Sequence, residues 1–283
     1  MKYSPWLVAA VMIFCLSDAT CVTASPPYNF GVNPHRSAAT TAQYCNPILS
    51  YVTRKSGVPL ELKVERTGQD YSVKVSQGAY DFAYTNHIFS PSASRAGYRV
   101  FARPNEDTIR GEIVVLKNSP VQRIEELNGL EVGFPHKAAF VAYAVSLDAL
   151  TRRGVNVKQV FGGTQEGIMA QLKAGKVAAA CVNSQVMRDF SARENVPYRV
   201  LWQSREYYNL PLVSHPRVPG KTVSAVRKAM VEMAADPEGR KILETSAAVI
   251  GQKPPFGFEP SSNAEYQDQW DFYATTVVPE LKK

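Results

Sequence analysis

The sequence contains few cysteines. Only 4 of its 283 residues are cysteine, and Cys15 and Cys21 fall in an N-terminal segment that we expect to be removed. Cys45 and Cys181 remain and allow at most one disulfide. Because these two residues lie in different halves of the chain, a bridge would restrict motion between the halves, and we expect two buried free thiols instead. The alternative is a thiolate site for a soft ligand such as arsenite.

Histidine is equally scarce, and the familiar catalytic spacings are missing. The 4 histidines form no His-x-x-x-His or His-Glu-x-x-His pattern, and the sequence has no Gly-x-Ser-x-Gly. These patterns mark zinc sites and serine hydrolases. We therefore expect no metal site, no cofactor and no catalytic centre. Scattered ligands can still converge in a fold, so a metal site built from turn histidines is the alternative.

Long apolar runs are confined to the N-terminus. Lys2 precedes an apolar run at residues 6–16, and Val22, Thr23 and Ala24 form a small-residue site. This layout predicts a secretory signal peptide over residues 1–24 that is cleaved near Ala24. The run is too short to span a bilayer, although an uncleaved anchor is the alternative. No later segment is expected to cross a membrane, so the mature protein should be soluble and exported.

The positive charge is dispersed. The formal net charge is +7, and it stays unchanged when Lys2 and Asp18 leave with the signal peptide. Lysine and arginine form no block of five or more and do not alternate with aromatic residues. We therefore expect no nucleic-acid partner. A basic exported protein is suited to anionic ligands or anionic surfaces.

Strand and helix patterns alternate along the mature chain, and this order occurs twice. In the first half, apolar spacing predicts strands at residues 28–32, 60–64 and 80–84 and helices at 40–55 and 70–77. In the second half it predicts strands at residues 113–116, 130–134, 157–161 and 177–182, a helical turn at 124–127, and helices at 138–153 and 165–174. The returning part is predicted to hold strands at residues 198–202 and 210–214 and helices near 222–235, 237–246 and 266–281.

These patterns predict an α/β protein of two lobes, each an open, mainly parallel sheet flanked by helices. We assign residues 25–112 to the first lobe, 113–205 to the second, and 206–283 to the return into the first lobe and the C-terminal helices. The hinge is expected near residues 111–115 and 200–210. Trp270, Phe272 and Tyr273 are expected to pack on the first lobe.

A cleft should lie between the carboxyl ends of the strands of the two lobes, because turn amides and helix N-termini converge there. The residues at the predicted strand ends are mostly polar and neutral. They are Asn33, His35, Gly68, Gln69, Tyr71, Thr85, Asn86, His87, Pro135, His136, Lys137, Gly163, Thr164, Gln165, Asn183 and Ser184.

Seven segments of the chain together resemble one protein family, although none is specific alone. They are Tyr44-Cys45-Asn46-Pro47-Ile48-Leu49, Asp70-Tyr71-Ser72, residues 77–84, Glu126-Leu127-Asn128-Gly129, Phe161-Gly162-Gly163, residues 174–180 and residues 199–204. Their order and spacing resemble the periplasmic phosphate, phosphite and phosphonate-binding proteins of ABC importers, which are type II periplasmic binding proteins. The resemblance covers nearly the whole mature chain. It implies a periplasmic clamp that closes around a small solute, and it places Tyr71 and Tyr84 in the cleft.

Departures from the family pattern bear on the ligand. The family's Ser-Thr-Ser-type run, whose hydroxyls grip the phosphonate, corresponds to His136, Lys137 and Ala138 followed by Ala139 and Phe140. The family's histidine after Gly-Gly is replaced by Thr164-Gln165, and its acidic residue near the end of the second-lobe strand is replaced by Asn183. The loss of that counter-charge disfavours a 2-aminoethylphosphonate-like ligand. The helix start still offers backbone amides and a favourable dipole.

We therefore predict a monomeric, exported solute-binding protein that captures a small oxyanion or compact organic anion for an ABC permease. The alternative role is a ligand sensor, for an oxyanion such as arsenite, that partners a membrane histidine kinase. An enzyme on the same scaffold is a further alternative. The predicted ligand-binding residues are Tyr71, Tyr84, Thr85, Asn86, His87, His136, Lys137, Ala138, Gln165 and Asn183.

Overall fold

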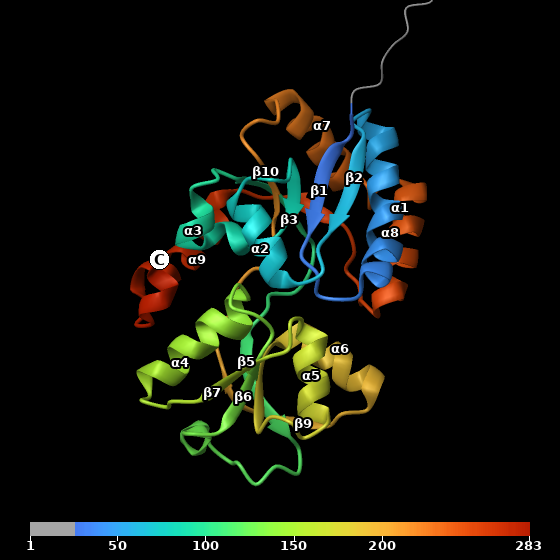
Figure 1. Cartoon of the computed structure of the whole chain (residues 1–283). Coiled ribbons are helices and arrows are strands. Elements are labelled where there is room, and N and C mark those ends of the chain that lie inside the picture. The colour runs from blue at the N-terminus through green and yellow to red at the C-terminus, as the bar shows by residue number, and fades with distance from the viewer. Residues whose placement is uncertain (1–25) are drawn as a thin grey trace, which may run out of the picture.

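The protein forms two lobes, each a β-sheet flanked by helices, and they lie one above the other in Figure 1. A computed structural model describes residues 26–283. The expected signal peptide and its cleavage site at Ala24 lie outside the described residues. Within residues 26–283, no helix is both long and apolar enough to span a membrane. The two-lobed α/β fold predicted from the sequence is confirmed.

The sheet of the first lobe has six strands taken from both ends of the chain. In spatial order they are β11 (Phe258–Pro260), β4 (Arg99–Pro104), β10 (Leu212–Ser214), β3 (Phe82–Tyr84), β1 (Tyr28–Val32) and β2 (Leu60–Val64). β1 pairs in parallel with β2 and β3, whereas β10 and β11 pair antiparallel to their neighbours. The sheet is therefore mixed, not mainly parallel as predicted, because the strands that return from the second lobe run the opposite way.

The sheet of the second lobe is also mixed. Its order is β7 (Lys158–Phe161), β6 (Glu131–Phe134), β8 (Ala179–Asn183), β5 (Gly111–Leu116) and β9 (Tyr198–Gln203). β6 pairs in parallel with β7 and β8, while β5 runs antiparallel to both β8 and β9. β5 enters the lobe and β9 leaves it. These two strands therefore direct the chain from and back to the first lobe.

The helices cover both sheets, and their boundaries follow capping residues. The longest, α1 (Ala38–Ser56), begins where the Ser37 hydroxyl accepts a hydrogen bond from the Thr40 amide, and it ends at Gly57, whose φ is +69°. Figure 1 shows α1 beside α8 at one side of the first lobe. The other helices are α2 (Gly68–Ser76), α3 (Pro91–Ser94), α4 (Ser146–Arg152), α5 (Gln165–Lys173), α6 (Ser184–Glu194), α7 (Gly220–Val231), α8 (Pro237–Ile250) and α9 (Gln267–Thr275).

Several short helices complete the chain: η1 (His87–Phe89), η2 (Ile124–Leu127), η3 (Phe140–Val145), η4 (Asn263–Tyr266) and η5 (Pro279–Lys282). η3 is a π-helix that continues into α4. Its wide first turn is visible in the hydrogen bond from the Ala144 amide to the Ala139 carbonyl. The single helix predicted over residues 138–153 is thus a π-helical turn followed by an α-helix. The predictions omitted α3, α6, β4 and β11.

The lobes are joined by two chain crossings that pair with each other. Ile109 and Tyr207 exchange backbone hydrogen bonds of 2.8 and 2.9 Å, forming an isolated antiparallel bridge. The first crossing was predicted at residues 111–115, but those residues lie inside β5, so it occurs just before that strand. The second crossing lies between β9 and β10, within the predicted segment at its C-terminal end.

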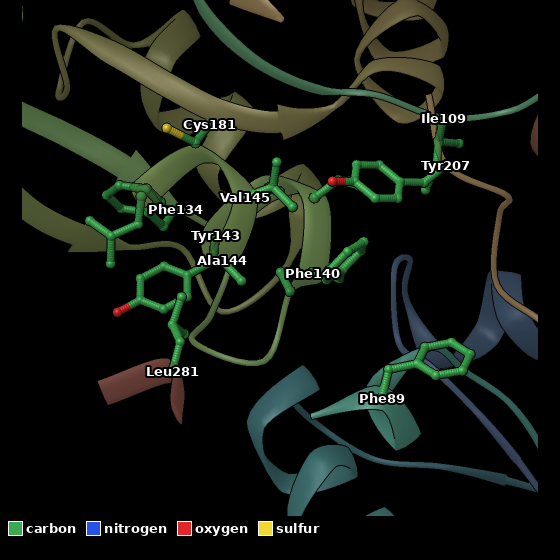
Figure 2. Packing of buried hydrophobic residues seen from close by; sticks show 14 of the residues in the cluster. Phe89, Ile109, Phe134, Phe140, Tyr143, Ala144, Val145, Cys181, Tyr207 and Leu281 are labelled. Atoms are coloured by element: carbon green, nitrogen blue, oxygen red, sulfur yellow. The ribbon is translucent and has the colours of Figure 1, made fainter. Parts of the chain in front are cut away.

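One apolar cluster extends across both lobes at the crossings (Figure 2). Phe140 of the second lobe is 2% exposed and meets the Tyr207 ring at 4.9 Å. Phe272 of α9 approaches the Phe140 ring at 5.4 Å, whereas Trp270 meets Phe89 of the first lobe at 4.6 Å. The prediction that the C-terminal aromatic residues pack on the first lobe therefore holds for Trp270, whereas the rings of Phe272 and Tyr273 pack against Phe140 of the second lobe, because α9 lies between the lobes.

The end of the chain is also attached to the second lobe. The Asp148 carboxylate on α4 accepts hydrogen bonds from the Thr276 hydroxyl at 2.7 Å and the Val277 amide at 2.8 Å. Leu281 of η5 lies beside Tyr143 in Figure 2. The C-terminal segment, residues 267–283, thus forms a third connection between the lobes, in addition to the two crossings.

Candidate ligand-binding site

A polar cavity lies between the lobes, beside the crossings. Its volume is about 60 Å³, and residues of both lobes and of both crossings line it: His35, Arg36, Tyr44, Tyr84, Glu106, Asn183, Gln185, Val186, Asp189, Asn209, Ile250 and Gln252. We call it the inner cavity. A larger cavity of about 790 Å³ shares Arg36, Glu106 and Asp189 with it and extends to the loop that follows α8. We call this one the outer cavity.

The first lobe contributes tyrosine hydroxyls and an arginine to the inner cavity. The Tyr44 hydroxyl donates to the Gln252 side chain at 3.4 Å. Burial, and then the nearby Glu106 carboxylate, raise the pKa of Tyr84 well above its usual value, so this phenol stays protonated and can donate a hydrogen bond. Arg36 follows β1 and reaches Asp189 of α6 with an N–O distance of 3.9 Å. This ion pair joins the two lobes.

The second lobe contributes the amide of Asn183, which ends β8. Its Oδ1 accepts hydrogen bonds from the Gln185 and Val186 amides at 2.9 and 3.3 Å and so caps α6. Its backbone amide donates to Gln165 Oε1 at 3.2 Å. The side chain is 3% exposed, and its Nδ2 makes no hydrogen bond to residues 26–283. This donor is therefore available to a ligand in the inner cavity.

A carboxylate at the first crossing adds negative charge to the inner cavity. Glu106 Oε2 accepts a hydrogen bond from Asn209 at 2.7 Å, and the same Asn209 amide donates to Gln185 at 2.9 Å. Burial raises the pKa of Glu106, while the hydrogen bonds and Arg36 oppose that shift. The inner cavity therefore combines neutral donors, one guanidinium and two carboxylates.

Three histidines lie at the contact between the lobes; His35 lines the inner cavity, and His87 and His136 lie behind it. His87 of η1 and His136 after β6 meet edge to face, with ring centroids 5.8 Å apart. They are 2% and 6% exposed, and His35 lies beside them. Burial lowers the pKa of His136 to about 4, and burial together with Arg36 and His136 lowers the pKa of His35 to about 3. All three rings are therefore neutral near pH 7.

The structure brings Tyr84, Gln165 and Asn183 together at the inner cavity or directly behind it, and it places other predicted residues elsewhere. Tyr71 is fully buried, and its hydroxyl donates to the carbonyls of Gly31 and Tyr84 at 3.3 and 3.2 Å. It supports the sheet and does not reach the cavity, in contrast to the prediction. The Thr85 hydroxyl accepts from the His87 amide at 3.0 Å and shapes the turn, and Asn86 is buried in the same turn.

Lys137 and Ala138 lie on the opposite side of the histidine contact. They line a separate cavity of about 150 Å³ together with His87, Ser90 and residues of the C-terminal segment. They lie where the resemblance in the sequence places the hydroxyl run of the family. His136, which precedes them, packs against Gly68 at the start of α2: a Cβ added there would lie 2.1 Å from the His136 Nε2 atom. The His136 ring therefore separates Lys137 from the inner cavity.

Sequence reasoning missed all three charged residues of the inner cavity, Arg36, Glu106 and Asp189. Glu106 and Asn209 lie on the crossings, and Gln185 and Asp189 lie on α6, a helix that the predictions did not include. The signal for α6 was present, because Asn183 is a favoured N-cap residue and Val186, Met187 and Phe190 recur at helical spacing. Among residues 26–283, no group of three or more His, Cys, Asp or Glu side chains has a metal-binding arrangement.

The two cysteines among residues 26–283 are free and buried. Burial raises the pKa of Cys45 to about 12 and raises that of Cys181 further, so both remain thiols at neutral pH. Neither lines the inner cavity. The expected free thiols are confirmed, and the alternative of a thiolate ligand site finds no support in these two environments.

Solved structures of solute-binding proteins share this fold. A binding-protein component of an ABC phosphonate transporter from Pseudomonas aeruginosa is similar, with a TM-score of 0.74, 16% identity, and coverage of 91% of this chain and 93% of that one. PhnD1 from Prochlorococcus marinus in complex with methylphosphonate gives a TM-score of 0.73 at 14% identity, covering 87% and 97%. An ancestral arginine-binding protein gives 0.55 at 18% identity, covering 77% and 96%.

No curated protein sequence matches this chain. The profile of a protein family does match it, over residues 30–266, and that family is described as the phosphonate periplasmic substrate-binding protein of ABC transporters. The match includes most of both sheets and every residue of the inner cavity, and it agrees with the resemblance found in the sequence. The chain belongs to the periplasmic phosphonate-binding protein family of ABC transporters.

Proposed function

We propose that this solute-binding protein holds a compact organic anion, such as a phosphonate, in the inner cavity and presents it to an ABC permease. The observation that carries the proposal is the side-chain Nδ2 donor of Asn183, which makes no hydrogen bond within residues 26–283; the residue is 3% exposed and lines the cavity between the lobes. Buried polar groups rarely lack partners unless a ligand or water supplies them. Arg36 and the Tyr84 hydroxyl lie on the opposite wall and complete a set of donors for an oxyanion.

The dimensions of the cavities bear on the ligand. The inner cavity is suited to a single oxyanion group, at about 60 Å³. The outer cavity, at about 790 Å³, offers room for an organic substituent on that group. Because ligand contacts in the inner cavity come from both lobes, binding would favour the closed arrangement over an open one. Family membership favours this import role over the sensor alternative.

Replacing Asn183 by Asp tests the site. Aspartate keeps the side-chain oxygen that caps α6, so the helix start should be preserved. The change replaces the free amide donor by a carboxylate that repels an anion. We expect methylphosphonate affinity, measured by isothermal titration calorimetry at pH 7.5, to fall at least about 30-fold, which corresponds to about 2 kcal/mol for one lost donor to a charged group.

A matched control is Asn195 replaced by Asp, which also converts an asparagine of the second lobe to aspartate but lies away from both cavities, after the end of α6. Its affinity should equal that of the parent protein. If Asn183→Asp binds methylphosphonate as tightly as the parent, the assignment of the inner cavity is wrong. A screen of phosphite, phosphate, sulfate and arsenite under the same conditions would then define which anion the protein prefers.

The remaining features of the proposal concern the protein as a whole. We infer that it acts as a periplasmic monomer, cleaved near Ala24, without a nucleic-acid partner and without catalytic activity. The absence of catalysis is supported by the neutral, buried state of Cys45 and Cys181, since the thiolate is the reactive form of cysteine. Residues 25–112 and 206–283 would form the first lobe and residues 113–205 the second.

A further inference from the structure

His87 and His136 form a direct contact between the two lobes. His87 belongs to η1 of the first lobe and His136 follows β6 of the second, and their ring centroids are 5.8 Å apart. The His136 ring also presses on the backbone of Gly68, where an added Cβ would lie 2.1 Å from its Nε2 atom. The two rings can therefore keep these positions only while the lobes are closed on each other.

Both rings are buried without a full set of hydrogen-bond partners. His87 and His136 are 2% and 6% exposed, and the Nδ1 atoms of both have no partner within residues 26–283. The Nε2 atom of His87 lies 3.3 Å from the Asn33 amide, whose own Oδ1 also has no partner among these residues. A protonated imidazole would need an acceptor for each of its two N–H groups, and the Nδ1 atoms of both rings have none within residues 26–283.

The charged and titratable groups around the two rings do little to favour protonation. In the first lobe, the groups close to the His87 and His136 rings are His35, Arg36 and the Tyr71 ring. Lys137 follows His136 in the second lobe, and the C-terminal segment places Tyr273, Glu280 and Lys283 around the cavity behind His87. Glu280 makes no hydrogen bond to either ring in the described chain, and Asp189 pairs with Arg36.

We propose that the contact between His87 and His136 makes closure of the lobes depend on pH, so that acidification opens the clamp and releases its ligand. This inference rests on the proposed function for its ligand-binding consequence, but the opening itself does not require a ligand. Two adjacent imidazolium rings would repel each other, and each would lose hydration on burial. Separation of the lobes would expose both rings to water and remove both costs.

The sign and size of the effect follow from the pKa of His136. Burial lowers it to about 4 in the closed protein, whereas an exposed histidine titrates near 6.5. Because the folded-state pKa is depressed, closure keeps its full stability above pH 6.5 and loses it as the pH falls from 6.5 toward 4. His136 alone should weaken closure about 20-fold between pH 7 and pH 5. The pKa of His87 is also lowered by burial and by His136, so His87 steepens the dependence.

The first experiment measures methylphosphonate affinity by calorimetry between pH 7.5 and pH 5 for the parent protein, His136→Gln and His215→Gln. Glutamine keeps a polar group without a titrating ring. His215 lies near Tyr98 on the first lobe, away from the contact, and serves as the matched control. As the pH falls, the affinity of the parent and of His215→Gln should decrease more than that of His136→Gln, by up to about 20-fold, the shift in the closure equilibrium. Protonation of methylphosphonate itself changes the measured affinity equally for all three proteins, so it cancels in the comparison.

The second experiment needs no ligand. Small-angle X-ray scattering of the ligand-free parent should show a radius of gyration that increases between pH 7 and pH 5, and a smaller increase for His136→Gln. Nuclear magnetic resonance can follow the histidine rings directly, because the chain has 4 histidines. If His136 titrates near pH 6.5 in the closed protein, or if all three proteins share one pH profile, the inference is overturned.

The two proposals fail in distinguishable ways. If the parent protein binds none of the tested anions at pH 7.5, the proposed ligand class is wrong, while scattering and resonance titration still test the histidine contact. If methylphosphonate binds but its affinity has the same pH dependence in His136→Gln and the parent, the import role stands and the pH dependence of closure does not.

Discussion

Replacing Asp148 by Ala should release the C-terminal segment from the second lobe. Asp148 is 7% exposed, and one of its oxygens accepts hydrogen bonds from the Thr276 hydroxyl at 2.7 Å and the Val277 amide at 2.8 Å. The other oxygen accepts from Arg152 at 2.6 Å. The carboxylate thus connects α4 to residues 276–277 through acceptors that alanine cannot replace.

The magnitude follows from the two bonds to the C-terminal segment. Hydrogen bonds to a charged group contribute about 1.5–3 kcal/mol each, and an orphaned buried donor adds to the loss. We take about 3 kcal/mol as the free-energy cost of losing these two bonds. The ion pair with Arg152 adds little to this cost, because Arg152 is half-exposed and the pair lies within one helix. A change of this size raises the equilibrium constant for local opening about 100-fold.

Hydrogen–deuterium exchange with mass spectrometry measures this opening directly. In Asp148→Ala, amides in residues 276–282 should exchange about 100-fold faster than in the parent. The matched control is Asp271→Ala on α9, where an exposed carboxylate accepts from Gln267 at 3.0 Å within one helix. Such a pair contributes about 0.2–0.5 kcal/mol, so exchange should change by no more than about twofold. Equal exchange in Asp148→Ala and the parent would refute the role of this carboxylate.

Two further substitutions test the contacts between the lobes. Gly68→Ala places a methyl group against the His136 ring, and this overpacking, at about 1–3 kcal/mol, should lower methylphosphonate affinity about tenfold. Adding His136→Ala to the same chain should remove the clash and restore affinity. A double variant that binds no better than Gly68→Ala would contradict this. Phe140→Ala should cost about 3–5 kcal/mol in urea unfolding, since the ring meets Tyr207, Phe272 and Tyr273. Phe161→Ala, at 39% exposure, should cost less than half as much.

Local sequence patterns were sufficient for most of the secondary structure. Strands β1 and β2 begin and end at the predicted residues 28–32 and 60–64, because apolar residues there are bounded by turn-forming residues. Helix α1 extends one or two residues beyond its prediction and stops at Gly57, where a positive φ favours glycine. These features depend on neighbours in sequence, so the sequence alone could predict them.

The pairing of the strands could not be read in the same way. The predictions favoured mainly parallel sheets, because β-α-β order implies parallel neighbours. β10 instead inserts between β3 and β4 and runs antiparallel to both. Nothing in the short segment Leu212–Ser214 distinguishes a central strand from an edge strand, since its partners are distant in sequence.

The site was predicted only in part for a related reason. Asn183 and Gln165 follow strand ends, and the structure joins them by a hydrogen bond. Arg36 and Asp189 meet across the lobes, yet neither carries a local pattern that indicates the other. Tyr71 is a different case: its position in the sequence fits the cleft, but its hydroxyl donates to two backbone carbonyls in the sheet, an orientation that depends on the packing of strands β1 and β3.

The split construction of the first sheet has a consequence for how the protein is made. β10 lies between β3 and β4, but residues 212–214 are synthesised only after the whole second lobe. Until then, the edges of β3 and β4 that pair with β10 remain exposed in the emerging chain. Unpaired strand edges template aggregation, and pairings that join distant residues form slowly. During export, the newly made chain should therefore need a chaperone that covers these edges, and fragments that end before β10 should aggregate even though the second lobe is complete.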